Sequence, residues 1–314
     1  MSLDHRSVAF TTPLLALTII LALAACRTSE MSVKPSISVF ASPDDASKAL
    51  MAAAKSDDQN PLLTIFGPDS KQVILSGDAV QDRIAITSFA SGYEVMHRWQ
   101  KLADGSQLLL VGADNFPFPI PLKKNSDGKW FFDTAAGKDE VWNRRVGRNE
   151  LAIIDVCEGI REAQTDYVST FHDEARQYAT KFVSDPGKQN GLYWKPADGQ
   201  PPSPLGPLAA AAASEGYSDK PEGHGPFHGY YFRMLMGQSD KAPGGARDYV
   251  VNGNMTGGYA FVAYPAEYGN SGVTTFMMNQ DGVLLQKDLG KTTREAASAM
   301  NTFDPDAAWN IVEE

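Results

Sequence analysis

Residues 149–171 carry the most regular apolar pattern in the chain, and this pattern restricts the fold more than any other feature. The stripe positions recur at spacings of three and four: Ile153, Val156, Ile160, Ala163, Tyr167 and Thr170. This spacing predicts one long helix with an apolar face and an acidic, solvated face. Asn149 is placed to cap the helix, and Glu150 to lie in its first turn. Cys157 lies beside the stripe, which favours a buried structural thiol.

Strand patterns dominate the chain after residue 229. The segment "GYYFRMLMG" alternates and predicts a strand with four side chains on one face: Tyr230, Phe232, Met234 and Met236. Further strands are expected at "GGYAFVAYP", "VTTFMMN" and "VLLQKDL", with turns at Asn252–Gly253 and "NQDG". The pattern predicts an antiparallel meander of about five strands that packs on the long helix, with Trp309 docking the C-terminal tail.

The preceding residues, 44–140, predict an N-terminal unit of two helices and a small antiparallel sheet. The helices are expected over residues 44–55, capped by Asp44 or Asp45, and 77–93, capped by Asp78. The sheet ends in "DGKWFFDT", with Trp130 and Phe132 on one face. The outline is similar to cone-shaped NTF2-like folds, an analogy at the level of the fold alone. Residues 141–314 form the second domain, and the fold class of the whole is α+β.

A long connector of low regularity, residues 195–227, separates the helix from the strands. Only residues 208–216 favour a short helix within it. A connection of this length indicates a functional loop or a cover over the sheet.

The N-terminus has the features of an export signal. Arg6 precedes an apolar run over residues 14–25, which is too short to span a bilayer comfortably. The residues "LAAC" that end at Cys26 resemble the bacterial lipobox. That resemblance implies cleavage between Ala25 and Cys26, diacylglycerol and palmitate on the new N-terminus, and a membrane-anchored protein of the cell envelope. Residues 1–25 are then the signal peptide and 26–43 a lipid-anchored tether, and Arg27 favours the outer membrane over the inner, with a periplasm-facing body.

Charge and motif content exclude several classes of protein. The formal net charge of −10 and a pI of about 5.0 disfavour a nucleic-acid partner. The basic segment "NRRVGR" at residues 143–148 is more typical of capping and ion pairing. Two cysteines make no disulfide framework, and no phosphate-binding or dinucleotide-binding motif occurs, so no cofactor is expected.

The stretch "VAYPAEYGNSGVTTF" at residues 262–276 mixes strand residues with reactive side chains. Pro265 ends one strand and two glycines allow a turn, so turning alone accounts for the loop. "GNSG" looks like the protease motif "GDSG", but no histidine lies in a matching segment, so Ser271 is not expected to be a nucleophile. A buried ion pair of Glu267 with Arg233 or Arg247 is expected. Arg233, Glu267 and Tyr268 are candidate binding residues, and no catalytic residue is assigned.

His224 and His228 lie four residues apart in "EGHGPFHGY". With Glu222 they have the residue types of a surface metal site, but glycines and a proline exclude a helical ligand pair, and no third or fourth ligand follows from the sequence. The loop is therefore expected to bind no metal.

Three segments together resemble a bacterial family of unknown function, domain of unknown function 2950: "FDTAAGKDEVWNRRVGRNELAIIDVCEGIREAQTDY", the region from "GYYFRMLMG" to "NQDGV", and "TFDPDAAW". The resemblance implies no known activity. The helix segment and the strands that follow also look like the head of type IV pilins and pseudopilins. Arg144, Arg145 and Arg148 replace the apolar stem through which pilins polymerise, so assembly into fibres by that route is not expected.

The sequence favours a lipid-anchored envelope protein with a non-catalytic binding or structural role and an envelope protein as possible partner. A different class remains open, a hydrolase or lyase with a pocket in the N-terminal unit that contains His97, Asp114 or Asp133. A third alternative is an accessory component of a secretion or pilus system.

Overall fold

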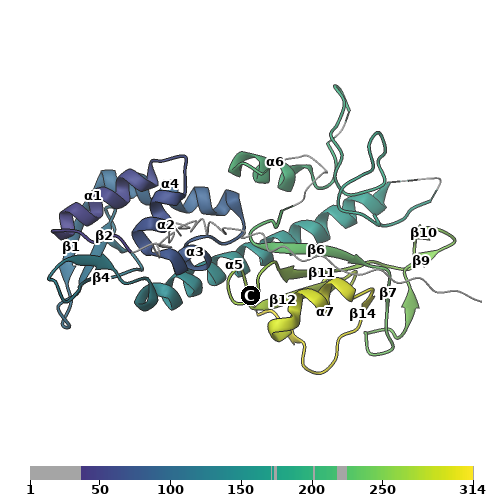
Figure 1. The fold of residues 1–314 in the computed structure, drawn as a ribbon. Helices are drawn as coiled ribbons and strands as arrows, with labels where there is room; N and C mark the ends of the chain where they lie inside the picture. The colour runs from purple at the N-terminus through teal and green to yellow at the C-terminus, as the bar shows by residue number, and fades with distance from the viewer. Residues whose placement is uncertain (1–36, 171, 173–174, 201, 218–224, 314) are drawn as a thin grey trace, which may run out of the picture. The chain divides into compact units, whose positions relative to one another are not determined.

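The computed structural model describes residues 37–170, 172, 175–200, 202–217 and 225–313 (Figure 1). The expected signal peptide, Cys26 and most of the tether lie outside these residues. The described residues form an α+β fold of helices and mainly antiparallel sheets, as the sequence predicts. None of the helices within these ranges combines the length and the apolar composition needed to cross a bilayer.

The N-terminal part holds more helix than the sequence pattern predicts. Its helices are α1 (Pro43–Ala54), α2 (Asn60–Phe66), the 3-10 turn η1 (Pro68–Ser70), α3 (Lys71–Ile74) and α4 (Ala79–Val95). Its strands are β1 (His97–Lys101), β2 (Gln107–Val111), β3 (Phe116–Pro117), β4 (Leu122–Lys124) and β5 (Trp130–Phe132), in the order β1-β2-β4-β5 with β3 paired to β2. The segment "NPLLTIF" of α2 is a helix because Pro61 suits a first turn and the side chains of Leu62, Ile65 and Phe66 are buried in the core.

Capping explains where two of these helices begin. Asp78 caps α4, as predicted, and its Oδ1 accepts the backbone N–H groups of Val80 and Gln81 at 3.1 and 3.2 Å. The predicted cap of α1 is wrong, because Ser42 caps that helix and accepts the N–H of Asp45 at 3.1 Å. Pro43 at the first helical position then places the two aspartates in the first turn.

An aromatic cluster forms the core of the N-terminal part. Phe132 of β5 is fully buried, as is the predicted face of that strand. Its ring lies 5.4 Å from the ring of Phe66, 5.9 Å from that of Phe118 and 6.3 Å from that of Phe40. These rings come from a loop, a helix and two parts of the sheet region, so they hold the helices and the sheet together.

Helix α5 (Thr134–Ser169) is one helix of 36 residues, and it begins well before the predicted start. Asp133 caps it and accepts the N–H of Ala136 at 3.1 Å. The predicted Asn149 cap is wrong, because no proline interrupts residues 134–149 and the helix runs through them. Gly137 lets its first turn approach β3 and β4, since a Cβ there would lie 2.7 Å from the Cα of Ile120.

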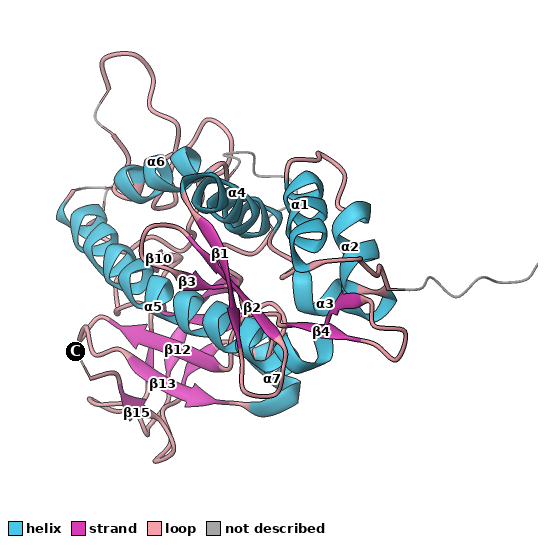
Figure 2. Ribbon diagram, turned by 90° about the vertical axis from the view of Figure 1, so that its left-hand side faces the viewer, coloured by secondary structure: helices cyan, strands magenta, loops and turns pink. Residues whose placement is uncertain are grey.

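The C-terminal part is built on a five-stranded sheet, in the order β15-β13-β12-β11-β6, of which Figure 2 labels β15, β13 and β12. Its strands are β6 (Tyr230–Leu235), β11 (Ala260–Pro265), β12 (Thr274–Asn279), β13 (Leu285–Asp288) and β15 (Asn310–Ile311), all antiparallel. Small sheets are made by β7 (Gly237–Gln238), β8 (Arg247–Asp248) and β14 (Thr302–Phe303), and by β9 (Val250–Val251) with β10 (Asn254–Met255). The predicted meander is therefore confirmed, and positive φ angles at Asn252 and Gly253 make the predicted turn between β9 and β10.

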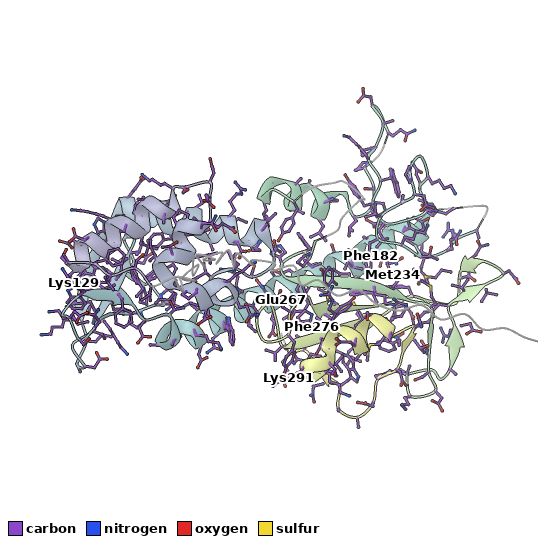
Figure 3. The ribbon with its side chains drawn as sticks, in the orientation of Figure 1. Lys129, Phe182, Met234, Glu267, Phe276 and Lys291 are labelled. Carbon is purple, nitrogen blue, oxygen red and sulfur yellow. The ribbon has the colours of Figure 1, made fainter. Side chains whose placement is uncertain are left out.

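Both faces of this sheet are covered, because every residue of β11 is buried. On one face α5 approaches through Gln164, whose amide lies 3.8 Å from the sulfur of Met234. On the same face Phe182 (labelled in Figure 3), which follows α5 and precedes the connector, packs edge-on against Phe232 and Phe261. On the other face α7 (Thr293–Ala299), which follows η2 (Gly290–Thr292), contacts β11, and Arg294 lies over the ring of Tyr231.

Four further predictions can be compared with the fold. Cys157 is fully buried, as predicted, and burial raises the pKa of its thiol. Met236 does not share the face of Met234, because β6 ends at Leu235 and the Met236 side chain is 41% exposed. Helix α6 (Gly206–Glu215) forms in the connector close to the predicted residues and ends at Gly216 with φ 105°. Trp309 packs against the core, with Lys287 over its ring.

Replacing Phe132 by alanine should lower the free energy of unfolding by about 3–5 kcal/mol, because it leaves a cavity among the surrounding rings. Leu151→Ala is the control, since that side chain on α5 is 68% exposed and its loss should cost less than about 0.5 kcal/mol. Urea unfolding of the two variants and the parent protein measures both values. Similar losses in the two variants would contradict the position of this core.

Candidate functional site

A cavity of about 640 Å³ lies between α4, α5 and the turn that joins β2 to β3. Leu62, Phe66 and Ile120 contribute to its apolar wall. Both helices present one face to it, and on α4 that face includes the exposed Ser88 and the half-buried Phe89. The cavity volume is typical of sites for small molecules.

The polar part of the wall is built by Asp82 and Arg145. Both oxygens of the Asp82 carboxylate accept the backbone N–H of Ser76, at 2.9 and 3.2 Å. Burial raises the pKa of Asp82, although the hydrogen bonds from Ser76 and the charge of Arg145 oppose this. Burial lowers the pKa of the Arg145 guanidinium, and the charge of Asp82 opposes that shift. Each charge therefore favours the ionised form of the other side chain.

Arg145 also joins α5 to the loop that follows β11. Its Nη2 donates to the carbonyl oxygens of Val73 and Ile74 at 2.7 and 3.3 Å, and its Nη1 donates to Oδ1 of Asn270. Asn270 in turn donates to Glu267 at 2.8 Å. Asp82 and Glu267 both line a second, smaller cavity of about 400 Å³. The hydrogen bonds of the Arg145 guanidinium therefore join α5 to α3 and to the loop after β11.

The next turns of α5 hold the same loop. Nδ2 of Asn149 donates to the carbonyl oxygen of Ser271 at 2.9 Å. Oε1 of Glu150 accepts the N–H groups of Val273 and Thr274, both at 2.9 Å. Residues 262–276 form the predicted turn between two strands. They also attach the sheet to the long helix.

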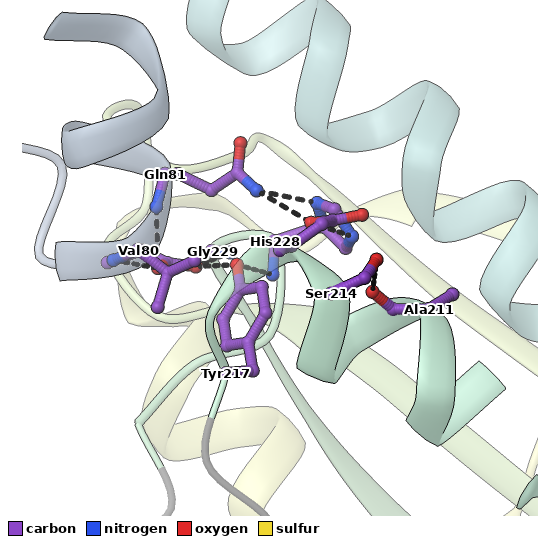
Figure 4. Close-up of polar contacts among 9 residues, drawn as sticks. Val80, Gln81, Ala211, Ser214, Tyr217, His228 and Gly229 are labelled. Atoms are coloured by element: carbon purple, nitrogen blue, oxygen red, sulfur yellow. Dashed lines mark hydrogen bonds and ion pairs between the residues drawn. The ribbon is translucent and has the colours of Figure 1, made fainter. Parts of the chain in front are cut away.

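A second polar cluster surrounds Asp78 at the start of α4 (Figure 4). Its Oδ2 accepts the hydroxyl of Tyr217 at 2.7 Å and the N–H of Gly229 at 3.1 Å. Nε2 of Gln81 lies 3.1 Å from Nδ1 of His228 and 3.3 Å from Glu215. Burial raises the pKa of the Tyr217 hydroxyl and lowers that of His228. The cluster fixes the end of α6 and the start of β6 to α4.

The predicted binding residues have three separate sets of partners. Arg233 donates to Asn301 at 2.5 Å, and Tyr268 donates to Asp288 at 3.0 Å. The predicted ion pair is wrong: Glu267 is exposed and bonded to Asn270, and Arg247 donates to the carbonyl of Gly257. Within the described residues no salt bridge joins Glu267 to either arginine.

Ser271 has a structural environment. It is fully buried, and its Oγ accepts the N–H of Glu267 at 2.9 Å and donates to the carbonyl of the same residue at 3.2 Å. Its hydroxyl therefore closes the turn.

Of the three residues expected in an enzymatic pocket, only Asp114 lines the large cavity. His97 stacks on Tyr93, with ring centroids 3.7 Å apart, and Asp133 caps α5 and pairs with Lys123 at 2.9 Å. His224 lies outside the described residues, and no group of histidine, cysteine or acidic side chains in the described ranges has the arrangement of a metal site.

Sequence reasoning missed the residues that shape the cavity. Asp82 and Gln81 line the cavity but have no motif that marks them, and Asp78 of the neighbouring polar cluster is predicted only as a cap. The three-and-four spacing of Arg144, Arg145 and Arg148 with Val141 does place them on one helix face, and this is the one signal that points to the cavity.

The fold and this site define an α+β protein with an apolar cavity beside an arginine-bearing helix. A family profile described as "Protein of unknown function (DUF2950)" matches residues 37–312, so the chain belongs to that family, as its motifs indicate. No curated protein and no solved structure matches the chain. The pilin-head resemblance therefore stays a prediction.

The stability of the protein should fall as the pH drops below about 6.5, the value for a histidine in an unfolded chain. Burial lowers the pKa of His228 in the folded state, with Arg148 acting in the same direction and Glu215 and Asp78 opposing it. The unfolded state therefore binds the proton more tightly, and protonation favours unfolding.

His228→Asn tests this, because asparagine tolerates the positive φ of 47° at this position. Urea unfolding at pH 7.5, 6.5 and 5.5 should show a smaller loss of stability in this variant than in the parent. His97→Asn, at a histidine outside the cluster, should keep the parent's pH dependence. An unchanged slope in His228→Asn would contradict the assignment.

Proposed function

We propose that this chain is an exported lipoprotein of the bacterial cell envelope, anchored through Cys26, with a non-catalytic binding role. We further propose that it binds an apolar small molecule in the cavity between α4 and α5. The observation that carries this proposal is the cavity of about 640 Å³ with its largely apolar wall. An interior of ordinary packing leaves few voids larger than a water molecule.

The polar groups of the wall support binding over catalysis. The Asp82 carboxylate is occupied by the N–H of Ser76, and the Arg145 guanidinium by backbone carbonyls and Asn270. A general acid or base needs a free oxygen or nitrogen within hydrogen-bond distance of its substrate. Groups held in this way give the cavity its shape and leave apolar contact as its main means of recognition.

A hydrolase or lyase is the second candidate, since the cavity lies in the N-terminal unit and Asp114 lines it with an exposed side chain. Asp114 is therefore the lining residue best placed to act as a general acid or base. Hydrolysis or elimination that depends on the cavity and is lost in Asp114→Asn would favour this candidate over a binding protein.

The cavity proposal predicts that the neutral fluorophore N-phenylnaphthylamine binds the protein. Ser88→Trp should weaken this binding at least about tenfold, or 1.4 kcal/mol, because an indole at the mouth of the cavity excludes the ligand. Titrations by fluorescence use the full chain carrying Cys26→Ser, so that no lipid anchor or detergent competes for the probe.

Ser91→Trp is the matched control, because Ser91 is exposed on the same helix and does not line the cavity. It should bind the fluorophore as the parent does. Equal affinities in the two tryptophan variants, or no binding by the parent, would contradict the proposed cavity ligand.

The anchor proposal predicts that cells expressing the protein incorporate radiolabelled palmitate into it and that Cys26→Ser abolishes the label. Cys157→Ala should keep the label, because the thiol of Cys157 is fully buried in the core of the C-terminal part and is not available for acylation. Label that persists in Cys26→Ser would show that the lipobox is misread.

A further inference from the structure

The large cavity has a polar end and an apolar end. Along α4 its lining residues run from Gln81 and Asp82 to Phe89 and Gly92, a distance of about 16 Å at 1.5 Å per residue. A ligand that lies along this helix therefore meets the charged lining side chain of α4, Asp82, at one end. An elongated amphiphile fits this gradient better than a compact apolar molecule.

The arginines of α5 approach the polar end. Arg145 lies close enough to Asp82 for each charge to favour the ionised form of the other, whereas the like charge of Arg148, one turn along the same face, lowers the pKa of Arg145. Val141 lies one turn before Arg145 on the same face of α5. It lines the apolar part of the cavity and packs against the core of the N-terminal part. The charge along α5 thus increases in the direction in which α4 becomes polar.

Of the three arginines that line the cavity, only Arg148 has no acidic partner among the described residues. Arg144 pairs with Glu140 at 2.7 Å and donates to the carbonyl of Pro117, and Arg145 is opposed by Asp82. Arg148 is exposed, and no ion pair or hydrogen bond joins it to another described residue.

Asp114, the other carboxylate that lines the cavity, does not neutralise Arg148 at the polar end. Asp114 lies two residues after Gly112, and Gly112 lies beside Gly92 at the apolar end of α4. A Cβ on Gly92 would be 3.8 Å from the backbone nitrogen of Gly112. The polar end of the cavity therefore has an exposed guanidinium without a partner among the described residues.

We infer that the occupant of the cavity is a single-chain amphiphile with an acidic head group, a carboxylate or a phosphate, which Arg148 binds while the chain lies along α4. This inference rests on the proposed cavity ligand and names its chemical class. A guanidinium recognises both acids through paired N–H donors, so the two share one mode of binding.

The test measures displacement of N-phenylnaphthylamine by four compounds with the same ten-carbon chain: decanoate, decyl phosphate, decanol and decyltrimethylammonium. The full chain carrying Cys26→Ser is the parent. Decanoate and decyl phosphate should bind about tenfold more tightly than decanol, or about 1.4 kcal/mol, and decyltrimethylammonium more weakly than decanol. Inorganic phosphate alone should displace no fluorophore, which distinguishes a lipid head group from free phosphate.

Arg148→Gln should remove most of this preference for acids and leave the affinity for decanol unchanged. Arg148→Lys should restore part of it, because a lysine keeps the charge but not the planar pair of donors. Arg83→Gln is the control with the same change in net charge, at an exposed arginine of α4 that does not line the cavity.

Two failures can be distinguished. If the parent binds no N-phenylnaphthylamine, the proposed cavity ligand is wrong and the acidic head group with it. If the fluorophore binds but decanol and decanoate displace it equally, or Arg83→Gln lowers the preference as much as Arg148→Gln, only the acidic head group is overturned.

Discussion

The fold depends on one continuous helix that is shared by two cores. The first turns of α5 pack on Ile120 in the aromatic core around Phe132, and its second half supplies the apolar stripe from Ile153 onward to the C-terminal sheet. A helix of this length gains little from its own hydrogen bonds in water, so most of its stability comes from packing. Between the two cores its buried face is polar, and Arg145, Asn149 and Glu150 each bind backbone or side-chain groups of distant segments.

Those polar residues make the middle of the helix costly to separate from its partners. A buried guanidinium or amide that loses its acceptor retains the full penalty of leaving water, about 1–3 kcal/mol for each unpaired group and more for a charge. The loop after β11 is therefore held by directional contacts, whereas the cores on either side are held by apolar burial. The large cavity lies against this polar segment, which explains why Arg145 and Asp82 lie at the same end of it.

The sequence predicts secondary structure best where one face of an element is buried along its whole length. The stripe of α5 from Ile153 to Tyr167, the presence of β11 and β12, and the Asn252–Gly253 turn all follow from local sequence, and each is confirmed. The start of α5 and the cap of α1 are wrong because a cap is decided by which of several competent side chains lies in reach of free N–H groups. The Glu267 ion pair is wrong for a related reason, since Asn270, three residues away, offers a closer partner.

The candidate site shows the same division. Local sequence patterns place Asp78 at the start of α4, but they put Arg144, Arg145 and Arg148 before the long helix, and only the extension of α5 back to Thr134 brings these arginines onto one helix face. The same patterns define the α+β class and the family to which the chain belongs. Only the folded chain decides that this face meets α4 across a void, that Arg145 is paired and that Arg148 is left exposed. Those outcomes depend on contacts between residues far apart in the sequence, such as Arg145 and Val73, and local spacing carries no information about which distant segments meet.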